Sequence, residues 1–67
     1  MPLIQITLSQ GRTVEQKREL VKVLTKETAR ILNSNEENMR IFLYEIPDEN
    51  WSDAGTLGID IKNTTWN

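Results

Sequence analysis

Residues 2–17 read PLIQITLSQGRTVEQK, and they decide the fold because a strand, a turn and a helix start follow one another there. Residues 2–8 alternate in hydropathy with a period of two, which predicts a β-strand. One face of this strand carries two isoleucines and Leu8, while Leu3 makes the opposite face partly apolar. Two semi-apolar faces suit a sheet that another subunit continues, and an ordinary strand of a small sheet is the alternative.

A long helix is predicted after the turn at Gly11. Thr13 and Gln16 have the three-residue spacing of a capping box at a helix start. Apolar residues then recur at helical spacing to about Leu32, and Asn33 tolerates the left-handed conformation that ends many helices. We expect one buried stripe along this helix, formed by Leu20, Val21, Leu24, Thr28, Ile31 and Leu32.

A second strand is predicted over Met39–Ile46, where the side chains again alternate. Pro47 ends it, because proline cannot donate a hydrogen bond to a strand ladder. The order strand, helix, strand is typical of a β-α-β unit, in which the two strands are parallel and the crossover is right-handed.

Residues 52–67 contain two glycines and a short apolar alternation at Leu57, Ile59 and Ile61. They predict a short hairpin or an arm that reaches onto a neighbouring subunit. The predicted fold class is therefore α+β: a single β-α-β unit with parallel strands and a short C-terminal hairpin or arm. We expect residues 1–67 to form one domain and its sheet to be completed by oligomerisation.

The chain is small enough to need support beyond its own core. A domain of 67 residues is marginally stable alone, and small scaffolds usually rely on disulfides, a metal or oligomerisation. Cysteine and histidine are both absent, so disulfides are excluded and the usual zinc ligands are missing. We therefore expect a homo-oligomer, and nothing in the sequence indicates a cofactor or a metal.

The charge pattern narrows the class of partner and the location. The net charge is −2, and acidic and basic residues are interspersed, which argues against a nucleic-acid binder. The N-terminus lacks the basic and apolar regions of a signal peptide, and no segment has the roughly 20 apolar residues of a membrane span. We expect a cytoplasmic protein that binds neither nucleic acid nor membrane.

The absence of histidine also narrows the chemistry. A general base near neutral pH must then be a shifted carboxylate, a lysine, a tyrosine or an N-terminal amine. Removal of Met1 would leave Pro2 with a free secondary amine at the head of a strand. An apolar pocket near cations would lower the pKa of that amine toward the working pH, as a base requires. A proline that simply begins a strand is the alternative.

Two arginines are candidate ligands for a carboxylate. Arg12 leaves the first strand and Arg40 opens the second, and neither follows the helix-surface pairing pattern of Arg18 or Arg30. Each has the planar donor group that binds a carboxylate bidentately, although solvated surface arginines are the alternative. Trp51 follows a polar run, where it is either a loop anchor or the apolar wall of a pocket.

The stretch PLIQITLSQGRTVEQK resembles the N-terminal motif of the 4-oxalocrotonate tautomerases. That motif combines an initial proline, an alternating strand, Gly-Arg, a hydroxyl residue and Glu-Gln-Lys at the helix start. The resemblance continues without a gap to Trp51, over about three quarters of the chain. It implies a β-α-β protomer that pairs into dimers and assembles as a hexamer, a trimer of dimers.

The resemblance also implies a role for each candidate residue. Pro2 matches the catalytic proline, which moves a proton from an enol oxygen to carbon or between carbons. Arg12 matches the arginine that binds the distal carboxylate of a dienol diacid, and Arg40 matches one that a neighbouring subunit contributes at the reacting end. Trp51 falls at an aromatic pocket position. The implied activity is a cofactor-independent isomerase, which interconverts the enol and keto forms of 2-hydroxydienoates or other 2-oxo acids.

Two other functions stay open. Asp53 lies about where a dehalogenase branch of the superfamily has a water-activating carboxylate, which would add water to an unsaturated acid with Pro2 as the acid. That branch has a second arginine where this chain has Ser9, and a solvated turn residue is the simpler explanation of Asp53. A non-enzymatic oligomeric paralogue is the third interpretation, because a retained Met1 would convert the Pro2 amine into an amide.

Overall fold

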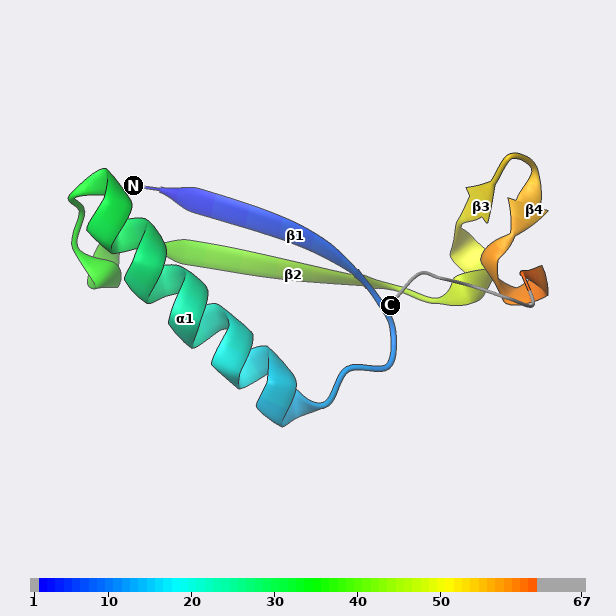
Figure 1. Ribbon diagram of the computed structural model, residues 1–67, viewed down its shortest axis with the longest axis horizontal. Coiled ribbons are helices and arrows are strands. Elements are labelled where there is room, and N and C mark those ends of the chain that lie inside the picture. The colour runs from blue at the N-terminus through cyan, green and yellow to red at the C-terminus, as the bar shows by residue number, and fades with distance from the viewer. Residues whose placement is uncertain (1, 62–67) are drawn as a thin grey trace.

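The computed structural model describes residues 2–61, which form one β-α-β unit followed by a small hairpin (Figure 1). Strand β1 (Leu3–Ser9) leads into helix α1 (Val14–Leu32), which returns the chain to strand β2 (Arg40–Ile46). The strands are parallel and pair along their full lengths. The predicted β-α-β unit is therefore confirmed.

Helix α1 has the predicted boundaries and caps. The hydroxyl oxygen of Thr13 accepts a hydrogen bond from the Gln16 N–H at 3.1 Å, and Gln16 Oε1 accepts from the Thr13 N–H at 2.9 Å. Both halves of the capping box are thus formed. At the other end, Asn33 is left-handed with φ 54°, and its N–H donates to the carbonyl oxygen of Ala29.

The helix covers one face of the sheet. Apolar side chains that alternate toward α1 are half-buried, and the side chains that point away from it are mostly exposed. The half-buried set comprises Ile4, Ile6, Leu8, Ile41 and Leu43. Ala29 and Met39 are the buried apolar side chains of the described residues. The core of a single protomer is therefore a thin layer between one helix and two strands.

The predicted stripe of α1 is buried only in part. Its first four positions are half-buried, whereas Ile31 and Leu32 are 68% and 57% exposed, so the expectation for these two residues was wrong within one protomer. Both residues lie on the last turn of α1, which ends at Leu32. Ile31 shares its face with the half-buried Leu20 and Leu24, so its exposure follows from its place at the end of the helix and not from the face it occupies.

The sheet face that points away from α1 is open. Leu3, Phe42 and Tyr44 lie on this face, each with about half of its surface exposed, at 51%, 47% and 48%. A parallel sheet normally has both faces covered, so a single protomer leaves apolar surface that another copy can bury. Among the described residues, no helix is both long and apolar enough to cross a membrane.

The chain beyond β2 forms a compact unit at one end of the sheet (Figure 1). A 3₁₀ turn (Asp48–Asn50) leads to the antiparallel strands β3 (Ser52–Asp53) and β4 (Thr56–Leu57). This confirms a hairpin, one of the two predicted alternatives for the C-terminal segment.

The apolar alternation beyond this hairpin does not form a strand. Leu57 ends β4, and the next residues form another 3₁₀ turn (Gly58–Asp60) before Ile61. The remainder of the predicted hairpin or arm, residues 62–67, lies outside the described residues, as does Met1.

Candidate active site

Pro2 lies at the head of β1, beside the first residue of β2. Its carbonyl oxygen accepts a hydrogen bond from the N–H of Arg40 at 3.2 Å, and the residue is half-buried. This bond ties the carbonyl group of Pro2 to the first residue of β2 and places the residue within the fold. A defined position is one requirement of a general base.

The side chain of Arg40 belongs to the opposite face of the sheet from α1. Successive side chains of a strand alternate, and the neighbouring Ile41 faces the helix. The guanidinium Nη1 donates to the carbonyl oxygens of Met39 at 2.8 Å and Glu37 at 3.2 Å. In this rotamer the arginine is exposed and bonds the backbone of the segment that precedes it, and it has no carboxylate partner among the described residues.

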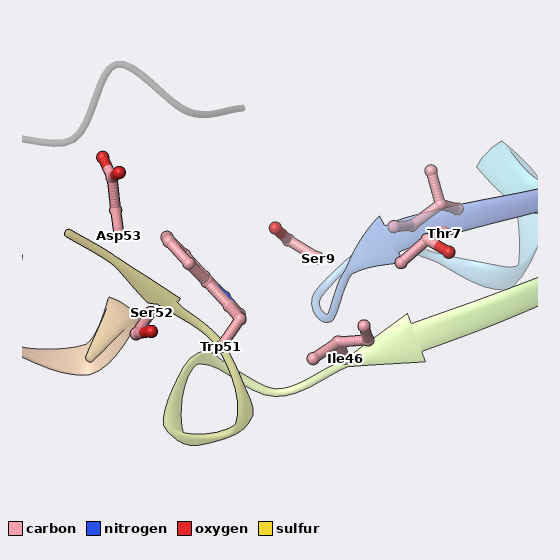
Figure 2. A pocket seen from close by; sticks show the side chains of 7 residues that line it. Thr7, Ser9, Ile46, Trp51, Ser52 and Asp53 are labelled. Atoms are coloured by element: carbon pink, nitrogen blue, oxygen red, sulfur yellow. The ribbon is translucent and has the colours of Figure 1, made fainter. Parts of the chain in front are cut away.

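A pocket of about 300 Å³ lies at the other end of the sheet, where both long strands finish. Trp51 and Ile46 form apolar walls, and Ser9 faces Trp51 across the opening (Figure 2). Asp53 stands at the rim of the pocket, with its carboxylate directed away from the strands (Figure 2). The lining is completed by Thr7, Leu8 and Ser52.

The indole of Trp51 is both a loop anchor and a pocket wall, which were the two alternatives for this residue. Its Nε1 donates to Asp48 Oδ1 at 3.4 Å, and its carbonyl oxygen accepts from the Gly58 N–H at 2.8 Å. The ring also packs closely against Gly58, where a Cβ would lie 2.4 Å from Cε2. The absence of a side chain at residue 58 therefore allows the indole to take this position.

Arg12 lines a second hollow, of about 260 Å³, between the end of β1 and the start of α1. The other lining residues are Leu8, Gln16, Lys17 and Leu20. Arg12 is exposed and forms no ion pair or hydrogen bond with the rest of the described chain. By contrast, Arg18 pairs with Glu15 and Arg30 pairs with Glu27 along the helix surface, as their spacing predicted.

One protomer does not bring the four candidate residues together. Pro2 precedes β1 and Arg40 begins β2, whereas Arg12 follows the end of β1 and Trp51 follows the end of β2. The seven residues of β1 separate these ends by about 20 Å, given a rise of about 3.3 Å per residue. A site that uses all four residues must therefore combine residues from at least two copies of the chain.

Sequence reasoning missed several residues that shape these hollows. The Trp51 pocket is lined by Thr7, Leu8 and Ile46. The sequence could have indicated them, because they are among the last residues of the two predicted strands, next to the segment that carries Trp51. Lys17 was also missed, although it lines the Arg12 hollow and pairs with Glu45 at 2.5 Å. The sequence could have indicated this pair, because Glu45 follows Ile41 and Leu43 on the strand face toward the helix, where a carboxylate needs a cation.

These features define a small β-α-β unit with Pro2 at one end of its sheet and an aromatic pocket at the other. Residues 2–58 match the family model for the tautomerase enzymes, and the chain belongs to this tautomerase family. A probable tautomerase of Ralstonia nicotianae is 42% identical over 55 residues, which cover 82% of this chain and 79% of that protein. The 2-hydroxymuconate tautomerase of Comamonas testosteroni is 33% identical over 82% of this chain and 87% of its own length.

Solved structures agree with this assignment. The crystal structure of a 4-oxalocrotonate tautomerase homologue has a TM-score of 0.86 and 38% identity, covering 94% of this chain and all of that one. A heterohexameric 4-oxalocrotonate tautomerase from Chloroflexus aurantiacus has a TM-score of 0.84 and 29% identity, covering 92% of this chain and all of its own. The fold is thus tautomerase-like, with a two-stranded sheet that oligomerisation completes.

Proposed function

We propose that this protein is a cofactor-independent tautomerase that interconverts the enol and keto forms of 2-hydroxydienoates or other 2-oxo acids, with the Pro2 amine as general base. The observation that carries the proposal is the half-buried Pro2, held at the head of β1 by the Arg40 N–H. The matched family and the named 2-hydroxymuconate tautomerase relative support this reaction class.

The proposed reaction moves one proton and needs no electron transfer. The unprotonated amine of Pro2 accepts the proton of the enol hydroxyl, which leaves a dienolate. The resulting ammonium then returns a proton to a carbon of the substrate, and the keto acid forms. Arg40 would stabilise the negative charge that develops on the oxygens, and Arg12 would bind a carboxylate at the far end of the substrate.

We propose that the site forms between copies of the chain. The pocket at Trp51 and the hollow at Arg12 lie about 20 Å from Pro2 in one protomer, so the proline of one copy would meet the pocket of another. Exposed Leu3, Phe42 and Tyr44 supply apolar surface for such an assembly. A homohexamer, a trimer of dimers in the cytoplasm, is the arrangement that we propose.

The activity depends on removal of Met1. An acylated proline nitrogen is an amide and has no useful basicity, whereas the freed secondary amine is a base. Desolvation against Trp51 and the nearby positive charge of Arg40 would lower the pKa of that amine. Activity should therefore rise with pH through the pKa of Pro2, because only the unprotonated amine accepts a proton.

The decisive experiment compares the processed protein with a blocked N-terminus. The intact mass is measured first, to establish that Met1 is absent. Ketonisation of 2-hydroxymuconate is then followed for the wild type, for Pro2→Ala and for a variant with an N-terminal extension. We expect losses of about 10²–10⁴-fold, the usual contribution of a positioned base. Equal rates from the processed and extended proteins would refute the proposal and favour a non-enzymatic scaffold.

A mixing experiment tests whether two copies share one site. Extended protomers, which lack the free amine, are unfolded and refolded together with Arg12→Ala protomers. If Pro2 and Arg12 come from different copies, about a quarter of the sites in a random mixture contain both intact residues. Sites within single protomers would remain inactive in every mixture, so the absence of recovered activity would reject a shared site.

Addition of water to an unsaturated acid is a second candidate, favoured by Asp53 at the rim of the Trp51 pocket. In this reaction a protonated Pro2 would donate a proton to carbon and Asp53 would activate water. The two reactions need opposite protonation states of Pro2 near neutral pH. An NMR titration of ¹⁵N-labelled Pro2 distinguishes them, because a low pKa supports the tautomerase and a high pKa the hydratase. Loss of water addition in Asp53→Asn would support the second reaction.

A further inference from the structure

The ion pair between Lys17 and Glu45 differs from the other ion pairs of the described residues. Lys17 Nζ lies 2.5 Å from Glu45 Oε1, and the two residues are 28 positions apart in the chain. It joins α1 to β2, whereas the pairs at Arg18 and Arg30 lie within α1 and three residues apart. Its side chains are also the more buried, at 26% and 30% exposed.

The position of Glu45 explains why it needs a cation. Glu45 pairs across the sheet with Leu8, and it continues the helix-facing positions of Ile41 and Leu43 on β2. A carboxylate in this row gives up part of its hydration, which costs free energy unless a positive group compensates it. Lys17, on the first turns of α1, supplies that positive group.

A second cation lies at the same hollow. Arg12 and Lys17 both line it, and so does Leu8, the strand partner of Glu45. Arg12 has no partner among the described residues, although a guanidinium binds carboxylates more strongly and more specifically than an ammonium does. The hollow is thus lined by two cations, Arg12 and Lys17, and the neighbouring Glu45 is paired with Lys17.

We propose that Lys17 is a positioning residue for Arg12: by holding Glu45, it keeps that carboxylate from pairing with the guanidinium, which stays available to a substrate carboxylate. The inference rests on the proposed role of Arg12 in binding substrate. Without Lys17, the carboxylate of Glu45, whose side chain is 30% exposed in the pair, would take Arg12 as its partner. The net charge of the three groups would fall from +1 to zero, and Arg12 would turn away from the substrate.

The test measures anion binding, so that it does not depend on turnover. Calorimetry of the processed protein with adipate, a saturated six-carbon diacid, reports the binding constant. We expect Lys17→Met to weaken adipate binding about tenfold, because one charge-assisted contact is lost. Lys17→Arg keeps a cation beside Glu45 and should bind like the wild type. Lys26→Met, an exposed lysine of the same helix without an ion pair to the described residues, is the control for lost charge and should have no effect.

The double variant separates positioning from a merely structural role. Lys17→Met with Glu45→Gln removes the competing carboxylate, so adipate binding should return to within about twofold of the wild type. Glu45→Gln alone frees Lys17 and should tighten binding several-fold, a result that does not require the Lys17→Met protein to fold. If the double variant binds as weakly as Lys17→Met, or if Glu45→Gln leaves binding unchanged, the proposal is overturned and the pair only joins helix to strand.

Kinetics supply the matching readout. With 2-hydroxymuconate, a diacid, Lys17→Met should raise KM about tenfold and leave kcat nearly unchanged, since Pro2 and Arg40 are untouched. An enol monoacid such as phenylenolpyruvate has no distal carboxylate, so its KM should not respond. A wild-type protein that binds adipate with the expected variant pattern but lacks ketonisation would reject the proposed function and retain this inference. An equal fall of kcat with both substrates would reject the inference alone.

Discussion

Gly58→Ala tests how closely the indole of Trp51 packs on the backbone beneath it. Gly58 is buried, and a Cβ at this residue would lie 2.4 Å from Trp51 Cε2, 2.5 Å from Cζ2 and 2.8 Å from the Asp48 carbonyl oxygen. Ordinary contacts of a Cβ are 3.4 Å or longer. The ring would therefore have to withdraw by about 1 Å, and the backbone at Asp48 would have to shift as well.

The expected loss in the free energy of unfolding caused by Gly58→Ala follows from these three close contacts. Overpacking a well-filled site by one methyl group typically costs about 1–3 kcal/mol. We place Gly58→Ala in the upper part of that range, at about 2–3 kcal/mol, because one of the three close atoms is backbone. Gly58 has no positive φ, unlike Gly11 and Gly55, so the cost is steric and not conformational.

The assay is urea unfolding followed by tryptophan fluorescence, at one fixed protomer concentration because an oligomer's stability depends on it. The chain has two tryptophans, so Trp66→Phe is introduced first and Trp51 becomes the reporter. We expect Gly58→Ala to lower the unfolding midpoint and to shift the native emission toward the red as the indole is displaced into water. The KM of the proposed substrate should rise, because Trp51 is a wall of the pocket.

A double-mutant cycle with Trp51→Ala isolates the contact, and its variants are all followed by far-UV circular dichroism, because Trp51→Ala removes the fluorescence reporter. Once the indole is removed, two of the three overlaps vanish, and Gly58→Ala should cost about 1 kcal/mol or less. If the substitution costs the same with and without the indole, or if it costs less than about 0.5 kcal/mol with native emission, the close packing of Trp51 on Gly58 is refuted.

Three smaller predictions follow from local geometry. Ala54 has φ 50° beside Gly55 at 87° in the β3–β4 turn, so Ala54→Asn, which is better suited to this conformation, should raise the unfolding free energy by up to about 1 kcal/mol in urea titrations. Thr13→Ala removes the N-cap oxygen that Gln16 uses and should lower stability by about 1 kcal/mol, with reduced protection of the first amides of α1 in hydrogen exchange. Glu27→Gln breaks an exposed pair and should change the melting temperature by no more than about 1–2 °C, at low or high salt.

The sequence alone determined the elements and their order. Alternation in residues 2–8, the capping box at Thr13 and the left-handed Asn33 are local signals, because they depend on neighbours within four positions. The parallel pairing also followed from sequence, since a strand, a long helix and a second strand leave few other connections. The resemblance to the tautomerases could also be recognised from sequence, because its motif lies in one continuous stretch that begins at Pro2.

Tertiary structure decided where the candidate residues lie relative to one another. Parallel strands already imply that Pro2 and Trp51 lie at opposite ends of the sheet, but only the tertiary structure shows the pocket that Trp51 forms with Thr7 and Ile46. The exposure of Ile31 followed from its place on the last turn of α1, since Leu20 and Leu24 on the same helix face are half-buried. The pairing of Lys17 with Glu45 likewise needed the helix to lie across the strand, because the two residues are 28 positions apart. Local propensity thus determined the helices and strands, and contacts between residues far apart in the sequence determined how the candidate site residues are arranged.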